Sequence, residues 1–349
     1  MKKFDKQKIN LMMSGVCLEK SALNFLIENY GKKFFNDDYV TTTGIMIEMN
    51  GGYLTAHINS DSKYKITYNN QNKIQLEYEG KFIPIKIWKP SPFMINCQKN
   101  NNGTPLTTFV NVHFDRARIN PISGCNNSCA YCSMNETPYK KNSIAEMDEA
   151  LKEAFKDNRV THVLISGGSP RPCDLKYLTD VYEYFCKKYP DYDFDVMMTP
   201  RGFDSYFDDT QYEPYIKHLK EIGVKGLAIN LELYNDELCS KYCKEKSRMG
   251  KDRYFKFLSL ASKEFGMENV RSGLIVGLES KEDTLKAVTE ICKCGCMPML
   301  SPYIPYNGIG GGYPSVDFLI DVYNDTEKIL KLYNIPLAPL CKKCKHNTL

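Results

Sequence analysis

The 349-residue chain is poor in several features that would define a class of protein at once. It contains a single tryptophan, and no apolar run approaches the roughly 20 residues that a membrane-spanning helix requires. Its formal net charge is only +4 and its basic residues form no block, so we expect no nucleic-acid-binding surface. These absences predict a globular protein with neither a membrane nor a nucleic-acid partner. They leave a small base or nucleoside open as a substrate.

Cysteine, by contrast, is abundant. Fourteen cysteines would suggest disulfide bonds in a short secreted protein, but 349 residues are enough for one large domain and a smaller one. The apolar stretch at residues 11–17 is short and is soon followed by Glu19 and Lys20, so we expect no signal peptide. We therefore expect a cytoplasmic location, where cysteines are thiols or metal ligands.

Residues 1–108 are expected to form a small N-terminal α+β domain that contains one antiparallel sheet. An amphipathic helix is predicted at residues 21–30 and ends at Gly31. Turn-forming residues such as Asn50-Gly51-Gly52 separate the predicted strands, which are residues 45–49, 53–58, 65–68, 74–78 and 82–88. We expect this domain to cover the larger one or to form a homodimer surface, with a linker at residues 96–105.

From about Phe109 onward, short apolar strands and amphipathic helices alternate six times. The predicted strands are residues 119–122, 160–165, 194–198, 226–231, 270–276 and 297–304. Such alternation predicts parallel strands joined by right-handed helical crossovers. Six units are two short of a closed eight-unit barrel.

The most informative stretch is the loop after the first of these strands, Gly124-Cys125-Asn126-Asn127-Ser128-Cys129-Ala130-Tyr131-Cys132. Its cysteines have the spacing C-x₃-C-x₂-C. Cubane iron–sulfur clusters are normally held by four thiolates, so a loop with three leaves one iron open to an exchangeable ligand. A zinc knuckle, or three thiols without a common function, are alternatives that the spacing alone leaves open.

This loop resembles the signature of the radical S-adenosylmethionine (SAM) superfamily. The resemblance implies that Cys125, Cys129 and Cys132 bind a [4Fe–4S] cluster whose open iron is chelated by SAM. An electron from the cluster would cleave a C–S bond of SAM, and the resulting 5′-deoxyadenosyl radical would abstract hydrogen from a substrate. The family core is a partial barrel. The expected fold class is therefore α/β, with a partial (β/α)₆ TIM-type barrel at residues 109–335 and a tail at residues 336–349.

Further segments at the predicted strand ends resemble the SAM-binding motifs of this family. Ser166-Gly167-Gly168-Ser169-Pro170 is similar to the Gly-Gly-Glu-Pro motif that holds the SAM amino group, with serine in place of glutamate. Because glycine lets a ligand approach the backbone, we expect Gly168→Val to block SAM binding while the cluster still assembles. Arg253 resembles the arginine that pairs with the SAM carboxylate in biotin synthase relatives. The resemblance implies SAM contacts at Tyr131, Gly167, Gly168, Ser169, Pro170, Thr199, Asn230, Glu232, Arg253 and Ile275.

The substrate is expected to lie beside SAM at the mouth of the barrel, because a radical must form next to the hydrogen it abstracts. We expect Glu232 and Tyr306 to act in catalysis. The predicted substrate-binding residues are Arg116, Arg118, Arg201, Tyr303 and Tyr306. This lining suits a small, polar, heterocyclic substrate better than an acyl chain.

The cysteine loop is similar to those of biotin synthase and the tyrosine lyases, and the overall layout resembles the queuine lyases of deazaguanine (queuosine) salvage. The resemblance implies a lyase that cleaves a bond in its substrate and takes electrons from a donor such as flavodoxin or ferredoxin. Radical SAM modification of a peptide or RNA, and a non-catalytic zinc-binding module, are the alternatives. A second metal site is predicted in the tail at Cys341, Cys344 and His346, whose spacing is typical of metal ligands.

Overall fold

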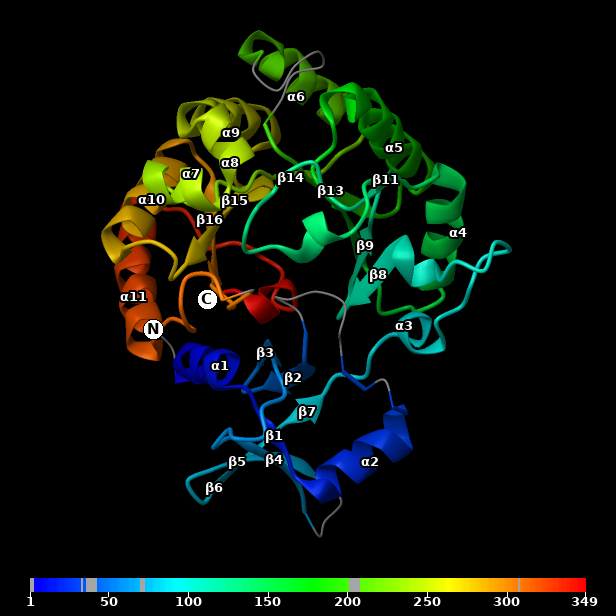
Figure 1. Cartoon of the computed structure of the whole chain (residues 1–349), viewed down its shortest axis with the longest axis vertical. Helices are drawn as coiled ribbons and strands as arrows, with labels where there is room; N and C mark the ends of the chain where they lie inside the picture. Colours follow the sequence, from blue (N-terminus) through cyan, green and yellow to red (C-terminus); the bar gives the residue numbers. More distant parts are fainter. Residues whose placement is uncertain (1–2, 33, 36–42, 70–72, 201–207, 307) are drawn as a thin grey trace.

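A curled, seven-stranded sheet forms the centre of the larger part of the molecule (Figure 1). The computed structural model describes residues 3–32, 34–35, 43–69, 73–200, 208–306 and 308–349. The strand order across the sheet is β16-β15-β14-β13-β12-β9-β8. The bounds are β8 Val110–His113, β9 Arg116–Ile119, β12 His162–Ile165, β13 Asp193–Met197, β14 Gly226–Ala228, β15 Val270–Val276 and β16 Met297–Pro302. From β9 to β16 all neighbours are parallel, which confirms the expected α/β partial barrel.

Strand β8 extends the sheet beyond the six predicted strands. It runs antiparallel to β9, and the turn between them contains Phe114, whose backbone is left-handed at φ 55°. All four residues of β8 are buried, including Asn111 and His113. Its sequence, Val110-Asn111-Val112-His113, nevertheless alternates apolar and polar residues, a pattern typical of a strand, so this hairpin with β9 could have been recognised from the sequence.

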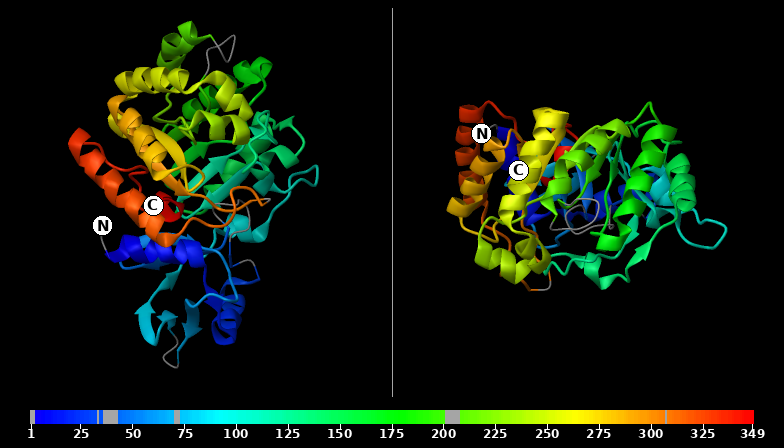
Figure 2. Two further views of the ribbon diagram at one scale, coloured as in Figure 1. Left: turned by 60° about the vertical axis from the view of Figure 1, so that its left-hand side comes forward. Right: turned by 90° about the horizontal axis from the view of Figure 1, so that it is seen from above.

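The longer helices lie around the outside of the sheet (Figure 2). Each helix packs an apolar stripe against the strands. In α5, Leu175–Lys188, this stripe contains Leu178, Val181 and Phe185. Two short helices, α7 Asp236–Tyr242 and α8 Lys244–Met249, follow β14 and were not predicted. The longer helices are α4 Ile144–Ala154, α5 Leu175–Lys188, α6 Tyr212–Glu221, α9 Lys251–Phe265, α10 Lys281–Lys293 and α11 Val316–Tyr333.

Serine caps fix the beginnings of several of these helices. The Ser280 hydroxyl accepts a hydrogen bond from the Asp283 amide at 3.0 Å at the beginning of α10. Ser143 and Ser315 cap α4 and α11 in the same way. These bonds satisfy amides that would otherwise have no partner in the first helical turn.

The N-terminal part contains two small sheets instead of the single antiparallel sheet that was expected. One has the order β1-β4-β5-β6, with β1 parallel to β4, and the other has the order β3-β2-β7. The strand expected at residues 82–88 is divided at Ile85, so its two halves join different sheets. The elements are α1 Lys3–Ser14, β1 Cys17–Leu18, α2 Lys20–Tyr30, β2 Ile45–Met49, β3 Gly52–Ala56, β4 Lys65–Tyr68, β5 Ile74–Tyr78, β6 Lys81–Pro84, β7 Lys86–Ile87 and α3 Pro92–Asn96.

The N-terminal sheets have a hydrophobic core separate from that of the barrel. It draws its buried residues from Leu11 to Ile87. Phe93 and Leu106 already belong to the barrel core, and Ile9 of α1 joins that core where α1 packs against α11 (Figure 1). Within the described residues, no helix is long and apolar enough to cross a membrane.

The C-terminal tail lies between the N-terminal sheets and the barrel (Figure 1). Its last residue, Leu349, donates a backbone hydrogen bond to the Leu300 carbonyl of β16 at 2.8 Å. On its other side, His346 Nδ1 lies 2.8 Å from the Thr55 hydroxyl of β3. The tail therefore connects the edge of the barrel sheet to the N-terminal sheets.

Candidate active site

The cysteine loop begins directly beyond the carboxyl end of β9. A short antiparallel pair, β10 Ile122–Ser123 and β11 Lys140–Lys141, closes the base of this loop. Cys125, Cys129 and Cys132 are all partly buried and line a cavity of about 680 Å³. This volume is within the range of about 300–1,000 Å³ that is usual for small-molecule sites.

The sulfur of Cys125 accepts two backbone hydrogen bonds. The Asn127 amide donates at 3.3 Å and the Ser169 amide at 3.1 Å. Burial raises the pKa of the Cys125 thiol, and these two amides partly offset that effect. Amide donors of this kind stabilise a negatively charged sulfur and tune iron–sulfur clusters. The loop geometry therefore suits a thiolate ligand at Cys125.

The other two cysteines face less polar surroundings. Contact with Cys243, followed by burial, raises the pKa of Cys129 above its ordinary value. Burial raises the pKa of Cys132 to about 11. Cys129 and Tyr131 pack against a small buried cluster that contains Cys239 and Cys243. The segment around α7 therefore supports this part of the cysteine loop.

The Gly-Gly-Ser-Pro turn after β12 packs directly on the cysteine loop. The Asn126 amide donates to the Ser169 carbonyl at 2.9 Å, and the Ser169 hydroxyl lies 3.2 Å from that of Thr199. A Cβ added at Gly168 would lie 1.7 Å from the Gly124 carbonyl oxygen and 2.7 Å from Cys125 Cα. Residue 168 must therefore be glycine, because the backbone of the cysteine loop occupies the space that any side chain would need.

This contact changes what a substitution at Gly168 does. The expectation that Gly168→Val would leave cluster assembly intact does not fit the structure, because any side chain would displace Gly124 and Cys125 first. From the sequence, the turn could be placed at a strand end, but its distance from the cysteine loop could not be judged.

A buried ion pair stands at the end of β14. Glu232 has a left-handed backbone at φ 73°, and its carboxylate accepts from Lys246 Nζ at 3.2 Å. Lys246 also donates to the Asn230 carbonyl at 2.7 Å. Burial disfavours the charge of Lys246, but Glu232 together with Tyr254, Cys129 and Cys243 outweighs this effect, so the pKa of Lys246 lies above its ordinary value. Both side chains line the cavity.

Most residues that the sequence suggested for cofactor and substrate reach this one cavity. Arg253 and Tyr306 are not among its lining residues, and Arg201 lies outside the described residues. The residues that line it are Arg116, Arg118, Cys125, Cys129, Tyr131, Cys132, Gly167, Gly168, Ser169, Pro170, Thr199, Asn230, Glu232, Ile275 and Tyr303.

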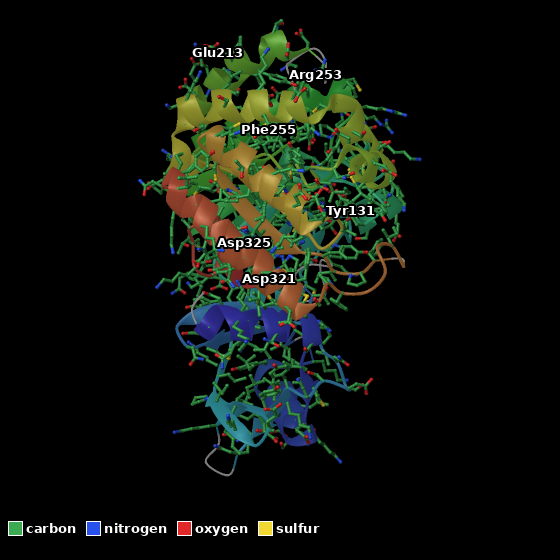
Figure 3. All side chains as sticks on the ribbon, turned by 90° about the vertical axis from the view of Figure 1, so that its left-hand side faces the viewer. Tyr131, Glu213, Arg253, Phe255, Asp321 and Asp325 are labelled. Carbon is green, nitrogen blue, oxygen red and sulfur yellow. The ribbon has the colours of Figure 1, made fainter. Side chains whose placement is uncertain are left out.

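Arg253 lies on α9, well away from Tyr131 (Figure 3). Its guanidinium donates to the Met249 carbonyl at 2.9 Å, in the helix that precedes its own. The cation that does reach the cavity is Lys246, on α8. Sequence reasoning missed Lys246 because the short helices α7 and α8 were not predicted.

Tyr303 and Tyr306, in the segment after β16, take part in hydrogen bonds within that segment. Tyr303 is 2% exposed, and its hydroxyl donates to the Ile309 carbonyl. The Tyr306 amide donates back to the Tyr303 hydroxyl at 3.3 Å. Tyr303 thus shapes one wall of the cavity and orders the loop beyond it.

The part of the cavity furthest from the cysteine loop is polar. Arg116 and Arg118 of β9 line it together with Arg271, which pairs with Asp195 at 2.7 Å. Arg116 Nε in this part, and Asn120 Oδ1 beside Gly167 nearer the cysteine loop, are buried and have no hydrogen-bond partner among the described residues. Buried polar atoms of this kind are normally satisfied, so a polar ligand is expected beside them.

Comparison with known proteins identifies the class to which this site belongs. Residues 119–291, from β9 into α10, match the radical SAM superfamily, and the chain belongs to that superfamily. It is a radical SAM enzyme, which cleaves SAM with the help of a [4Fe–4S] cluster and needs a reductant. No curated protein matches the chain.

Several solved structures are similar to this chain. SuiB from Streptococcus suis bound to S-adenosylmethionine is 14% identical, with a TM-score of 0.50 over 69% of this chain and 54% of SuiB. A radical SAM methyltransferase from Sphaerobacter thermophilus is 15% identical, with a TM-score of 0.49 over 80% and 77%. The FeFe-hydrogenase maturase HydG from Carboxydothermus hydrogenoformans is 16% identical, with a TM-score of 0.46 over 62% and 52%. The chain thus spans about half the length of SuiB and of HydG.

The contact between Gly168 and the cysteine loop generates a prediction. Gly168→Ala should lower both the iron content after anaerobic reconstitution and the binding of SAM, because even one methyl group collides with Gly124. We expect at least a several-fold loss of each, measured by iron and sulfide analysis and by equilibrium dialysis. Gly312→Ala is the control, since a Cβ there meets no atom within 4 Å. Full iron content with lost SAM binding would contradict this reading.

Proposed function

We propose that the enzyme is a lyase that cleaves a bond in a small, polar, heterocyclic substrate held in the interior of the half-barrel. The observation that carries the proposal is the cavity itself. One end is lined by the three loop cysteines, and the other end by Arg116 and Arg118. Because the two ends are continuous, a cofactor at the loop and a substrate in the interior would be in contact.

Cys125, Cys129 and Cys132 are proposed as the three protein ligands of the [4Fe–4S] cluster. When bound, the cluster and SAM together supply reductive C–S cleavage and abstraction of a hydrogen atom from the substrate. The protein's own contribution at this end is to hold three thiolates, with amide donors on Cys125, while leaving the cavity side of the loop open. Flavodoxin or ferredoxin is the proposed class of electron donor.

The SAM-binding residues are proposed from their positions around the same end. The Gly-Gly-Ser-Pro turn, Thr199 and Asn230 present backbone and polar groups to the cavity, and Ile275 offers an apolar surface for adenine. We propose Lys246, in place of Arg253, as the cation that meets the SAM carboxylate. Two of its three donors are used by Asn230 and Glu232, which leaves one for a ligand.

The substrate would be held by the polar interior. Arg116 Nε offers a donor at the inner end of the cavity and Asn120 Oδ1 an acceptor nearer the cysteine loop, so a ligand that carries both kinds of group could satisfy each at a different point along β9. Glu232, which lines the cavity and pairs with Lys246, is proposed to act on the substrate or to orient it. Queuine is the specific substrate we propose to test first. The match to the radical SAM superfamily argues against the alternative of a non-catalytic zinc-binding module.

The cluster assignment can be tested by replacing its ligands. Cys125→Ala, Cys129→Ala and Cys132→Ala, combined in one protein, should lose the roughly four irons of the cubane and all SAM cleavage. Iron content, the visible absorption of the reconstituted protein and 5′-deoxyadenosine formation measure this. Cys173→Ala is a suitable control, because that cysteine is exposed and lies outside the cavity. Retention of iron and activity by the triple variant would overturn the assignment.

The role of Lys246 can be separated from its ion pair. Lys246→Met alone leaves Glu232 unpaired, so the informative protein is the double variant Lys246→Met, Glu232→Gln. We expect at least tenfold weaker SAM binding, the loss of one charge-assisted hydrogen bond being worth about 1.5–3 kcal/mol. Arg253→Met should bind SAM as the parent does. The reverse result would restore Arg253 as the partner of the carboxylate.

The substrate proposal is tested by product analysis. Reconstituted protein, SAM and a reductant should convert queuine to a smaller deazaguanine, detected by mass spectrometry, and should form 5′-deoxyadenosine faster with queuine than without it. Glu232→Gln should reduce turnover at least tenfold while cluster content stays near that of the parent, because the side chain does not belong to the loop. If queuine is unchanged and leaves the rate of SAM cleavage unaltered, queuine is not the substrate.

A further inference from the structure

Four potential metal ligands converge at the end of the barrel opposite the cysteine loop. They are Asp115, His162, Cys341 and Cys344, and one ligand atom from each lies within 4.8 Å of all the others. Asp115 belongs to the turn before β9 and His162 begins β12, so both stand at the amino ends of parallel strands. The two cysteines come from the tail, about half the chain away in sequence.

The geometry around His162 is that of a ligand held in place. Its Nε2 lies 3.1 Å from Cys344 Sγ, while its Nδ1 lies 3.2 Å from the Thr161 hydroxyl. A metal-binding histidine typically uses one ring nitrogen for the metal and hydrogen-bonds through the other, which fixes the ring. Here Nε2 faces the sulfur and Nδ1 is the nitrogen that is fixed.

Asp115 gives an independent indication that a ligand belongs here. The residue is 7% exposed, and its Oδ1 is buried without a hydrogen-bond partner among the described residues. Its other oxygen, Oδ2, pairs with Lys343 Nζ at 3.1 Å. A buried carboxylate oxygen with no donor is costly, and a cation would satisfy it.

We propose that these four side chains bind one Zn²⁺ ion. Two thiolates, an imidazole and a carboxylate are ligands that zinc prefers, and four protein ligands are typical of a closed structural site. Bonds of about 2.0–2.3 Å in a tetrahedron separate ligand atoms by about 3.3–3.8 Å, close to the spacing already present. Lys343, beside Asp115, offsets part of the negative charge of the ligands.

The donor set argues against other metals. Calcium and magnesium take oxygen ligands, which only Asp115 provides here. An iron–sulfur cluster would bind its ligands through different irons and would hold them farther apart than a single ion does. His346, predicted from the sequence as the third ligand, is not in this group, because its Nδ1 lies against Thr55 of β3 and its ring contacts Phe114.

The ion would tie the tail to the amino end of the barrel. Cys344 lines the large cavity together with Asn347 and Thr348, so the tail forms part of the wall opposite the cysteine loop. Zinc would therefore hold this wall in place and would take no part in SAM cleavage. The proposal does not depend on the identity of the substrate, because it rests on the four ligands alone.

Metal analysis tests the proposal directly. Protein from zinc-replete cells, purified without chelators, should contain about one zinc per chain in addition to its iron. Cys341→Ser combined with Cys344→Ser should reduce zinc to below about a tenth per chain while reconstituted iron is unchanged. Cys97→Ser with Cys173→Ser is the matched control, since those thiols belong to neither site. His162→Gln should lose zinc and His346→Gln should keep it.

A second measurement does not depend on variants of the tail. The protein that carries alanine at Cys125, Cys129 and Cys132 has no iron–sulfur chromophore. After chelation, titration of it with Co²⁺ should give one equivalent of tetrahedral cobalt with thiolate charge-transfer absorption, displaced by Zn²⁺. Zinc-edge X-ray absorption of the intact protein should fit two sulfur and two lighter ligands. Zinc-free protein without such cobalt binding, or loss of iron instead of zinc in the tail variant, would overturn the proposal.

Discussion

The active end of this enzyme depends on the close packing of two backbone segments. The turn at Gly168 lies against Gly124 and Cys125 with no room for a side chain, and the Ser169 amide donates to the Cys125 sulfur. The cysteine loop has little regular structure of its own, so this contact and the short β10–β11 pair define its shape. A strand end thus positions the cysteine loop through main-chain contacts, which are independent of most side chains in the loop.

The sequence predicted the features that depend on local periodicity. Five of the six parallel strands and the helices α4, α5, α6, α9, α10 and α11 follow from the apolar patterns, and the hairpin β2–β3 follows from its Asn-Gly-Gly turn. The first strand was predicted at residues 119–122, whereas β9 is Arg116–Ile119 and shares only Ile119 with that prediction. The cysteine spacing identified the superfamily, and the strand-end rule placed most candidate residues around one cavity. These results need only short windows of sequence or the general geometry of parallel sheets.

What the sequence did not predict depends on contacts between distant segments. The break at Gly250, where φ is 80°, divides the region after β14 into α8 and α9, and this division brings Lys246 to the cavity and leaves Arg253 outside it. The proposed metal ligands of the tail likewise depend on contacts between distant segments. Cys341 and Cys344 were recognised by their spacing, but their partners Asp115 and His162 are brought to them only by the folded barrel. His346 fitted the local pattern and was therefore preferred.

The left-handed backbone of Glu232 has a consequence for how this site responds to mutation. A residue other than glycine at φ 73° costs roughly 1–2 kcal/mol. Glycine at 232 would relieve this cost, but it would also remove the carboxylate that faces Lys246. Because the loss of the partner of a largely buried lysine costs about 3–5 kcal/mol, more than the strain that glycine relieves, the ion pair itself stabilises this strained backbone, and selection for stability alone would retain the carboxylate.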